Sequence, residues 1–530
     1  MSTRSIPSRA EQSPRWSPAA SATPAPAIEA AIPPATALLR QPLWLLLAIV
    51  AVAAALRLHE LDRLSFWFDE AATVHFARMA PWEMWGRDTH PPLYYLLIHF
   101  WLLGGDSEWW LRLLSLLFSL GTLVGIYYAG RALGGVRVGL LAAALLALAG
   151  FELRFAQEAR MYAMLACATA WALSGLMPLL MRPAAASGPD SRRHWRNYVL
   201  GSLLAVWSHN MGFLWPVAAT AAVLPLLWAE PGRRALLLRW LKANVIVLVL
   251  WLPYWPWLLH QASGVLSGFH IEQPSIERLS NDLSWIHLGM RRPDEAWEFI
   301  GIALGLVPLA LGLATLRRRI AAALLLLIAV PVVVSLAMAV WQPLYANRVL
   351  LWTAQPSALL AAFGLDWLWR RRGYFLPVLT GLLLLLVLAA RGVAAWDYVY
   401  ERQKADWRGV METLAAELSA DSVVVLSPGF ESYTWTYYIG RLQQEGRPMP
   451  PLQLVQVLTG RQAQAMAALI ERSPERVTFI LSPWFDAERL VDPQEFLERT
   501  LGCARLVERR VFSGIYLLDF DTGPACASSG

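Results

Sequence analysis

Long apolar runs alternate with short polar connections over the first 391 residues of the chain. Runs such as 44–56, 321–340 and 375–390 carry almost no charge, and many approach the ~20 residues that an α-helix needs to cross a bilayer. The pattern therefore predicts about eleven membrane-spanning helices. The predicted spans are residues 41–58, 109–129, 138–153, 161–181, 197–210, 212–229, 244–260, 298–316, 320–341, 349–368 and 374–391.

The pattern changes after Arg391, where hydropathy falls and shorter helical and strand-like segments begin. The predicted strands are 422–426, 477–481 and a closing pair within 506–520, and the predicted helices are 406–418, 433–441 and 463–472. Strands that alternate with helices predict a small α/β domain with a partly parallel sheet. No Gly-rich loop follows a predicted strand, so we expect no nucleotide site in this domain.

These patterns divide the chain into four expected segments. Residues 1–40 form a Pro, Ala and Ser tract without the apolar core of a signal peptide, so we expect a disordered tail. Residues 41–391 form the predicted α-helical membrane domain. Residues 392–522 form the predicted soluble α/β domain, and 523–530 a flexible end.

The net charge of +6 raises the question of a nucleic-acid partner. The arginines, however, gather in every second connection, for example at 131–137, 192–196 and 317–319, which the positive-inside rule assigns to the cytoplasm. We therefore expect membrane lipid and no nucleic acid as a partner. The predicted orientation is a multi-pass inner-membrane protein with a cytoplasmic N-terminus and a periplasmic or extracellular C-terminal domain.

Charged and polar side chains concentrate in the connections predicted to be external. These connections are residues 59–108, 154–160, 209–212, 261–297 and 342–348. Asp69 and Glu70 follow the first span directly, and Glu158 and Arg160 lie in the next external turn. Because charge beside the hydrocarbon is costly, these residues are candidates for chemistry.

The order of the motifs resembles that of a known group of membrane enzymes. The motifs are Asp69-Glu70, His90-Pro91-Pro92-Leu93, Arg112-Leu113-x-Ser115, Gln157-Glu158-Ala159-Arg160-x-Tyr162, His209-Asn210, Pro253-x-x-Pro256, Pro343-x-Tyr345-x-x-Arg348 and Lys404-x-Asp406-Trp407-Arg408. Over residues 41 to about 410 the chain resembles the GT-C glycosyltransferases of the glycosyltransferase family 39 group. That group includes protein O-mannosyltransferases, the aminoarabinose transferase of lipid A, and transferases like the galacturonic acid transferases of lipopolysaccharide.

The resemblance implies a polyprenyl-phosphate sugar as donor and an inverting transfer to a hydroxyl of a lipid, polysaccharide or protein on the external face. Asp69 occupies the position of the base in the resembling enzymes, and Glu70 beside it would orient the acceptor or help to bind a metal. A plainer alternative is that the Asp-Glu pair caps an interfacial helix.

A leaving phosphate needs cations, and guanidinium groups suit it best. Arg160 and Arg348 are therefore the first candidates for the donor phosphate, with His90 and Arg112 behind them. The remaining candidates for substrate binding are Glu158, Tyr162, His209 and Tyr345. Four of these residues have structural alternatives: an ion pair with Glu158 or Glu152 for Arg160, an interfacial anchor for Arg348, loop packing for His90, and helix-end capping for His209.

The connection 261–297 contains residue types that bind metals, namely His270, Glu272, His287 and Asp294. Their spacing fits no helical ligand motif, so we predict neither a catalytic metal nor a cofactor besides the lipid-linked sugar. We interpret this connection as a mobile cover of the site. Cys503 and Cys526 would both lie outside, and the sequence leaves a disulfide between them open.

Three rival functions remain at this point. A transporter or flippase places ionisable groups in mid-span, whereas here they lie at the outer ends. A ligase or polymerase of lipid-linked glycans would have a large external loop among its later spans and would lack the early Asp-Glu pair. A non-enzymatic assembly factor would not depend on Asp69. The sugar, the acceptor and the polyprenyl length stay open.

Overall fold

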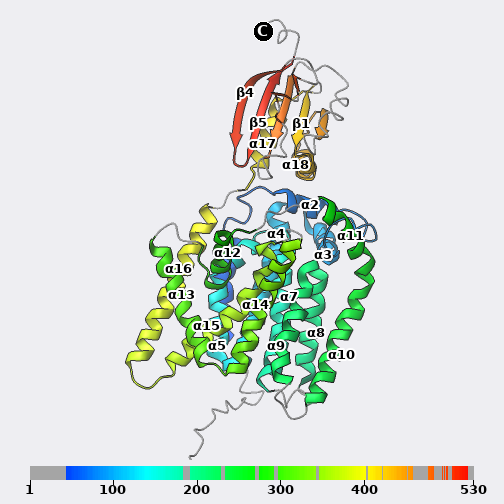
Figure 1. Cartoon of the computed structure of the whole chain (residues 1–530). Helices are drawn as coiled ribbons and strands as arrows, with labels where there is room; N and C mark the ends of the chain where they lie inside the picture. Colours follow the sequence, from blue (N-terminus) through cyan, green and yellow to red (C-terminus); the bar gives the residue numbers. More distant parts are fainter. Residues whose placement is uncertain are drawn as a thin grey trace, which may run out of the picture. The chain divides into compact units, whose positions relative to one another are not determined.

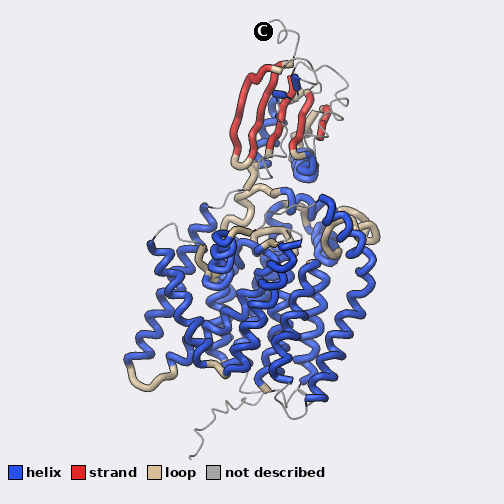
Figure 2. Tube along the Cα trace, viewed as in Figure 1, coloured by secondary structure: helices blue, strands red, loops and turns tan. Residues whose placement is uncertain are grey.

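The computed structural model describes the chain from residue 43 to residue 522 with gaps. The described residues are 43–182, 191–227, 233–268, 274–291, 296–341, 345–401, 404–419, 422–450, 452–456, 476–482, 492, 494–495, 497–498 and 504–522. Helices make up the bundle of Figure 1, and Figure 2 shows the strands gathered in one sheet apart from that bundle. Among the described residues, the strands follow the bundle in the sequence.

The helices of the bundle follow the apolar runs of the sequence. They are α1 (Leu43–Leu58), α2 (Phe68–Ala77), α3 (Leu93–Trp101), α4 (Glu108–Gly134), α5 (Val136–Ala147), α6 (Gly150–Ala156), α7 (Tyr162–Met181), α8 (Ser191–Ser208), α9 (Leu214–Leu227), α10 (Arg233–Trp251), α11 (Trp255–Gly268), α12 (Ile276–Leu288), α13 (Ala296–Thr315), α14 (Arg318–Trp341), α15 (Ala354–Trp369) and α16 (Phe375–Glu401). Each predicted span coincides with one of these helices or with a broken pair.

Within the described residues, seven helical segments are long and apolar enough to cross a membrane, and the bent pair α5–α6 raises this to eight. Three further apolar helices are shorter, among them α1. The protein is thus a multi-pass membrane protein, while the count of eleven spans stays a prediction. The helix α16 continues ten residues past Arg391, the end of the last predicted span, to Glu401.

Local chemistry explains where several helices begin. The Ser107 side chain accepts a hydrogen bond from the Trp110 backbone N–H and starts α4. The Ser275 side chain does the same for α12, and that of Asp406 for the helix after α16. Such N-caps satisfy backbone donors that a first helical turn leaves unpaired.

Small residues let neighbouring helices of the bundle approach closely. A Cβ atom on Gly201 of α8 would lie 2.5 Å from the carbonyl oxygen of Ala168 on α7. A Cβ atom on Gly364 of α15 would lie 2.2 Å from the carbonyl oxygen of Pro308 on α13. Close backbone packing of this kind stabilises helix pairs in lipid, where the hydrophobic effect contributes little between helices.

The bundle has two chemically different ends. At one end, Arg137 pairs with Asp366 at 3.9 Å, and Arg370 donates to the Gly134 carbonyl at 3.3 Å. These residues belong to the connections predicted to be cytoplasmic. At the other end, the connections predicted to be external contact one another, for example through Arg160 and Asp69 at 3.9 Å.

The C-terminal elements form a mixed α/β unit, as predicted. They are α17 (Trp407–Glu417), β1 (Val423–Ser427), α18 (Ser432–Gln444), β2 (Gln453–Gln456), β3 (Arg476–Leu481), β4 (Arg505–Phe512) and β5 (Ile515–Asp521). The strand order is β2-β1-β3-β5-β4, with parallel pairing among the first three and antiparallel pairing of β5 with β3 and β4. The sequence analysis missed β2, and the predicted helix 463–472 lies outside the described residues.

Strand alternation divides the core of this unit. Val424 and Leu426 face the large core that continues into the bundle, whereas Val423 and Val425 face a second, smaller core. Both sets are nearly inaccessible to solvent. The period of two along a strand produces this division.

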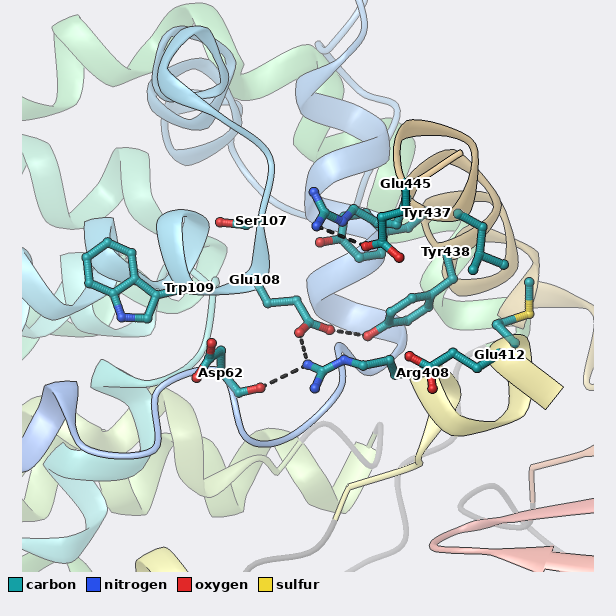
Figure 3. A pocket seen from close by; sticks show the side chains of 12 residues that line it. Asp62, Ser107, Glu108, Trp109, Arg408, Glu412, Tyr437, Tyr438 and Glu445 are labelled. Atoms are coloured by element: carbon teal, nitrogen blue, oxygen red, sulfur yellow. Dashed lines mark hydrogen bonds and ion pairs between the residues drawn. The ribbon is translucent and has the colours of Figure 1, made fainter. Parts of the chain in front are cut away.

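Glu108 ties the C-terminal unit to the first connection of the bundle. Figure 3 shows its carboxylate accepting hydrogen bonds from Tyr438 of α18 and from Arg408 of α17. The same carboxylate accepts from the Phe66 backbone N–H at 3.2 Å. A pocket of about 270 Å³ lies beside this contact. The segment before α2 is therefore held by elements far away in the sequence.

The described part of the segment 261–297, which was predicted to cover the site, contains a helix with several side-chain contacts. Its described part contains α12, whose Asp282 accepts hydrogen bonds from Asn347 at 2.6 Å and from Tyr345 at 3.2 Å. His287 contacts the hydroxyl of Ser357 at 2.7 Å. These contacts anchor α12, while the role of the connection as a mobile cover stays a prediction.

Candidate functional site

Asp69 and Glu70 lie in the first turn of α2, at the end of the bundle where the second set of connections meets. The N-cap residue is Trp67, and no side chain caps this helix. The capping alternative for the Asp-Glu pair is therefore not what the geometry shows. Acidic residues in a first turn still interact favourably with the helix dipole.

Glu70 is fully buried and surrounded by hydrogen-bond donors. Its carboxylate accepts from Arg112 at 2.8 and 2.9 Å, from Lys404 at 2.8 Å and from the Ala159 backbone N–H at 2.9 Å. Burial alone would raise the pKa of Glu70, but the charges of Arg112 and Lys404 outweigh it and lower the pKa to about 2. The carboxylate thus stays ionised and occupied by protein groups.

The side chain of Arg112 is likewise fully hydrogen-bonded to protein groups. Besides its two bonds to Glu70, its guanidinium donates to the backbone carbonyls of Leu61, Leu64 and Ser65 at 2.8, 2.8 and 3.2 Å. These bonds use all five N–H groups of the side chain. We therefore place Arg112 in the support of the site and not, as predicted, in contact with a substrate.

Asp69 has a different environment although it is the next residue in the chain. Its carboxylate oxygen Oδ2 lies 3.9 Å from Nε of Arg160 and 3.8 Å from Nη1 of Arg348. Both distances exceed that of a hydrogen bond. Within the described residues, no hydrogen bond to this carboxylate is found. Asp69 is thus a carboxylate between two guanidinium groups with its oxygens unoccupied.

The position of Arg160 is fixed through α2. Its Nη1 donates to the backbone carbonyl of Asp69 at 3.1 Å and to the hydroxyl of Thr73 at 3.0 Å. Arg348 is freer, because 31% of its side chain is exposed. Both guanidinium groups lie near the ring of Tyr162, at 6.0 and 5.6 Å from its centroid.

Two buried histidines lie beside these arginines. The rings of His90 and His209 are 4.3 Å apart, and His209 Nδ1 accepts from the Met211 backbone N–H at 3.0 Å. Burial, together with the nearby positive charges of Arg160 and Arg348, lowers the pKa of both histidines well below the ordinary value. Both rings are therefore neutral at neutral pH, and the arginines supply the positive charge.

Lys404 joins the site from the segment after α16. Its ammonium group lies 2.8 Å from Glu70 and 3.8 Å from Glu158. The sequence analysis included Lys404 in a motif but did not select it for the site. The signal was present, because Lys404 and Lys242 are the chain's two lysines and Lys404 opens that motif.

Several buried polar atoms around Asp69 have no hydrogen-bond partner in the described part of the chain. They are Trp67 Nε1, His90 Nδ1, Glu158 Oε2, Arg160 Nε, the Tyr162 hydroxyl and Asn210 Oδ1. Buried polar groups normally find partners, so such a group of atoms indicates that a polar ligand or ordered water completes the site. They come from three connections that are far apart in the sequence.

Tyr345 is a predicted site residue whose hydrogen bond is to α12 and not to the residues around Asp69. It is buried and its hydroxyl donates to Asp282 of α12. Tyr345 therefore positions α12 and the start of the turn that carries Arg348. The other predicted residues, His90, Glu158, Arg160, Tyr162, His209 and Arg348, gather around Asp69 through the contacts given above.

A metal site was not predicted, and among the residues that the structure describes no group of three or more His, Cys, Asp or Glu side chains could hold an ion. His270, Glu272 and Asp294 lie outside the described residues, as do Cys503 and Cys526. Metal dependence thus stays open to experiment.

Neither a protein-family model nor a curated protein sequence matches the chain. Solved structures do match it. ArnT from Cupriavidus metallidurans in the apo state has a TM-score of 0.58 at 13% sequence identity, covering 91% of this chain and 98% of that one. The same protein bound to undecaprenyl phosphate has a TM-score of 0.53 at 15% identity, with the same two coverages.

A third match comes from an archaeal enzyme. The oligosaccharyltransferase AglB from Archaeoglobus fulgidus, in complex with an inhibitory peptide and a dolichol-phosphate, has a TM-score of 0.51 at 12% identity. The match covers 82% of this chain and 69% of that one. ArnT and AglB are both GT-C fold glycosyltransferases. The chain is therefore a multi-pass membrane protein with the GT-C fold.

Proposed function

We propose that this protein is a glycosyltransferase that moves a sugar from a polyprenyl phosphate to a hydroxyl acceptor on the external face of the membrane. The observation that carries the proposal is the carboxylate of Asp69 between the guanidinium groups of Arg348 and Arg160, at 3.8 and 3.9 Å. A base and a phosphate site are the two things that this transfer requires.

In the proposed reaction, the acceptor oxygen attacks C1 of the donor sugar while Asp69 takes the hydroxyl proton. The bond between C1 and the phosphate oxygen breaks, and its electron pair leaves with the polyprenyl phosphate. Arg160 and Arg348 stabilise the charge that develops on this phosphate. A single displacement inverts the configuration at C1. Glu70 and Arg112 hold the first turn of α2 and take no part in the bond changes.

The donor class is supported by the structures with the same fold. One of them is bound to undecaprenyl phosphate and another to a dolichol-phosphate. Both ligands are polyprenyl phosphates, which need a cationic site at the end of the bundle and an apolar path for the chain. The acceptor, whether lipid, polysaccharide or protein, is not given by these likenesses.

The external face is supported by the separation of charges between the two ends of the bundle. Arg137 and Arg370 belong to the end with the arginine-rich connections, and Asp69 belongs to the other. By the positive-inside rule, this separation supports a site on the external face of the membrane.

The test is mass spectrometry of lipid, polysaccharide and protein fractions from a deletion strain complemented with wild type or with Asp69→Asn. Wild type should restore one missing glycan mass. Asp69→Asn should reduce it by roughly 10²–10⁴-fold, the contribution of a general base, while polyprenyl-phosphate sugar accumulates.

The matched control is Asp62→Asn, because Asp62 is an exposed aspartate of the same connection. It should restore the glycan like wild type. Full restoration by Asp69→Asn, or accessibility tagging that puts the Asp69 segment in the cytosol, would refute the proposal. A transporter would move its cargo without releasing polyprenyl phosphate from the donor, so that release by purified protein separates the two functions.

A further inference from the structure

The sheet of the C-terminal unit has a topological switch point. β1 pairs in parallel with β2 on one side and with β3 on the other. The chain leaves the carboxyl end of β1, forms α18 and enters β2, whereas β3 lies on the opposite side of β1. In open α/β sheets, ligands bind outside the carboxyl ends of the strands at such a point.

A cluster of oxygen atoms lies at this point. Ser427 is the last residue of β1, Ser482 follows β3, and Glu431 lies in the short 3₁₀ turn before α18. Glu431 accepts hydrogen bonds from Thr434 at 2.8 Å and from Ser482 at 3.3 Å. Ser482 in turn donates its backbone N–H to the Ser427 carbonyl at 3.0 Å.

This cluster has unused hydrogen-bonding capacity. The Ser427 side chain is 1% exposed, and its hydroxyl has no hydrogen-bond partner in the described part of the chain. Glu431 is 3% exposed, and no cation is paired with it among the described residues. A buried hydroxyl without a partner is costly unless a ligand or ordered water completes it, and the carboxyl of Glu431 keeps further acceptor capacity beside its two hydrogen bonds.

The turn that carries Glu431 packs on the helix that carries Asp69. Phe430 contacts Phe68 with their ring centroids 4.9 Å apart, and Tyr433 stacks on Phe68 at 5.8 Å. Phe430 precedes Glu431, and Phe68 precedes Asp69. Burial raises the pKa of Glu431 to about 7, and the negative charge of Asp69 adds to this rise. The turn of Glu431 and the first turn of α2 are therefore in contact through these rings.

The chemistry of this cluster differs from that around the arginines. A carboxyl and three hydroxyls donate to and accept from the hydroxyls of a sugar, whereas a carboxyl without a paired cation repels a phosphate. The neighbouring rings of Phe68, Phe430 and Tyr433 are partly exposed and offer flat apolar faces. A sugar ring has both properties, a polar rim and an apolar face.

We propose that Ser427, Glu431 and Thr434 form an acceptor subsite, in which Glu431 hydrogen-bonds a hydroxyl of a carbohydrate acceptor beside the hydroxyl that Asp69 deprotonates. This inference rests on the proposed function and names the acceptor as a sugar. It also gives the C-terminal unit a direct part in substrate selection, because the fold brings this turn onto α2.

The test compares Glu431→Gln with Glu412→Gln in the full-length protein. Glu412 is an exposed glutamate of α17 in the same unit and serves as the matched control. In the complemented deletion strain, Glu431→Gln should lower the restored glycan about tenfold or more, the size of a lost hydrogen bond to a charged group. Glu412→Gln should restore it fully.

The second readout is the affinity of the purified protein for undecaprenyl phosphate. Glu431→Gln should change this Kd less than about twofold, since the subsite does not contact the phosphate. Because a buried carboxyl can matter for folding, Phe430→Ala is the second variant. It should also lower the glycan and spare the Kd, with the thermal midpoint near that of wild type.

Several results would overturn the inference. Full glycan restoration by both Glu431→Gln and Phe430→Ala would do so, as would a Kd that weakens in parallel with the product. A restored mass found on serine or threonine of a protein would refute the carbohydrate acceptor. Failure of the proposed function looks different, because wild type itself would then restore no glycan and bind no undecaprenyl phosphate.

Discussion

Two neighbouring residues at the start of α2 have opposite surroundings. The Glu70 carboxylate accepts four hydrogen bonds, from Arg112, Lys404 and the Ala159 backbone, and is fully buried. The Asp69 carboxylate has no hydrogen bond in the described part of the chain and faces Arg160 and Arg348 at nearly 4 Å. One carboxylate is saturated by the protein, and the other is open to a ligand.

Helical geometry accounts for this difference. Successive residues of an α-helix point about 100° apart, so two adjacent side chains cannot share one environment. Glu70 points to α4, where Arg112 lies, and Asp69 points to the arginines before α7 and in the turn before α15. A single Asp-Glu pair can thus supply both a support and a reactive group.

The largest effect that would sharpen this comparison is on stability. Replacing Glu70 with Gln leaves Arg112 and Lys404 buried without their charge partner. Breaking a buried ion pair on one side costs roughly 3–5 kcal/mol of unfolding free energy. The thermal midpoint of purified protein in detergent should fall strongly, and transfer should be lost with it.

Asp69→Asn is the matched control for this prediction. It should lower the thermal midpoint less than Glu70→Gln does, because Asp69 makes two ion contacts at 3.8 and 3.9 Å and has no side-chain hydrogen bond to lose among the described residues. A stable Glu70→Gln protein with full transfer, or an Asp69→Asn protein that melts early, would contradict the division into support and reactive group.

Hydropathy and charge were enough to predict the fold class. The apolar runs located the helices, and the arginine-rich connections separated the two ends of the bundle, because both signals are local in the sequence. The strands β1, β3, β4 and β5 also follow from local runs rich in β-branched and other apolar residues. The extension of α16 to Glu401 and the short strand β2 were missed, since packing decides them.

The site could be predicted only as a set of residues. Asp69, Arg160 and Arg348 were selected, and they meet as expected. Arg112 and Glu70 have the same charges as the selected arginines and aspartate and also lie in motifs, yet they bind backbone groups of 61–65 and 159. These tertiary contacts decide which charged side chain has its hydrogen bonds made by protein groups. The sequence contains no local signal for such contacts.

A second effect concerns the stability of the folded protein at acidic pH. The pKa of Glu70 is about 2 in the folded protein and 4.5 ordinarily, so ionised Glu70 stabilises the folded state above about pH 4.5. This contribution, roughly 3 kcal/mol, should be lost progressively as the pH falls from about 4.5 to about 2. Thermal midpoints across this range should drop in wild type.

The variant Glu70→Gln supplies the reference for the acid effect. It cannot titrate at this position, so its difference from wild type should shrink as the pH falls. A difference that stays constant down to about pH 3 would mean that another group controls the acid sensitivity.

A third effect distinguishes Arg348 in the site from an arginine outside it by the loss of transfer activity. Arg348 is partly exposed and bound to the rest of the site mainly through Asp69 and Tyr162. Arg348→Gln should therefore reduce transfer by about 10²-fold, the effect of losing one group that stabilises developing charge, without a change in thermal midpoint. The control is Arg291→Gln, an exposed arginine paired with Glu401, which should retain full transfer.

The smallest expected effect concerns Tyr345, which the resemblance suggested as a substrate contact. Because its hydroxyl donates to Asp282, Tyr345→Phe removes one hydrogen bond that holds α12. Such a loss costs about 1 kcal/mol of stability, and Asn347 still binds the same carboxylate at 2.6 Å. Transfer and undecaprenyl phosphate affinity should stay within about threefold of wild type. A large loss of affinity without a loss of stability would contradict this structural role. Tyr345 would then belong with the residues that contact the ligand.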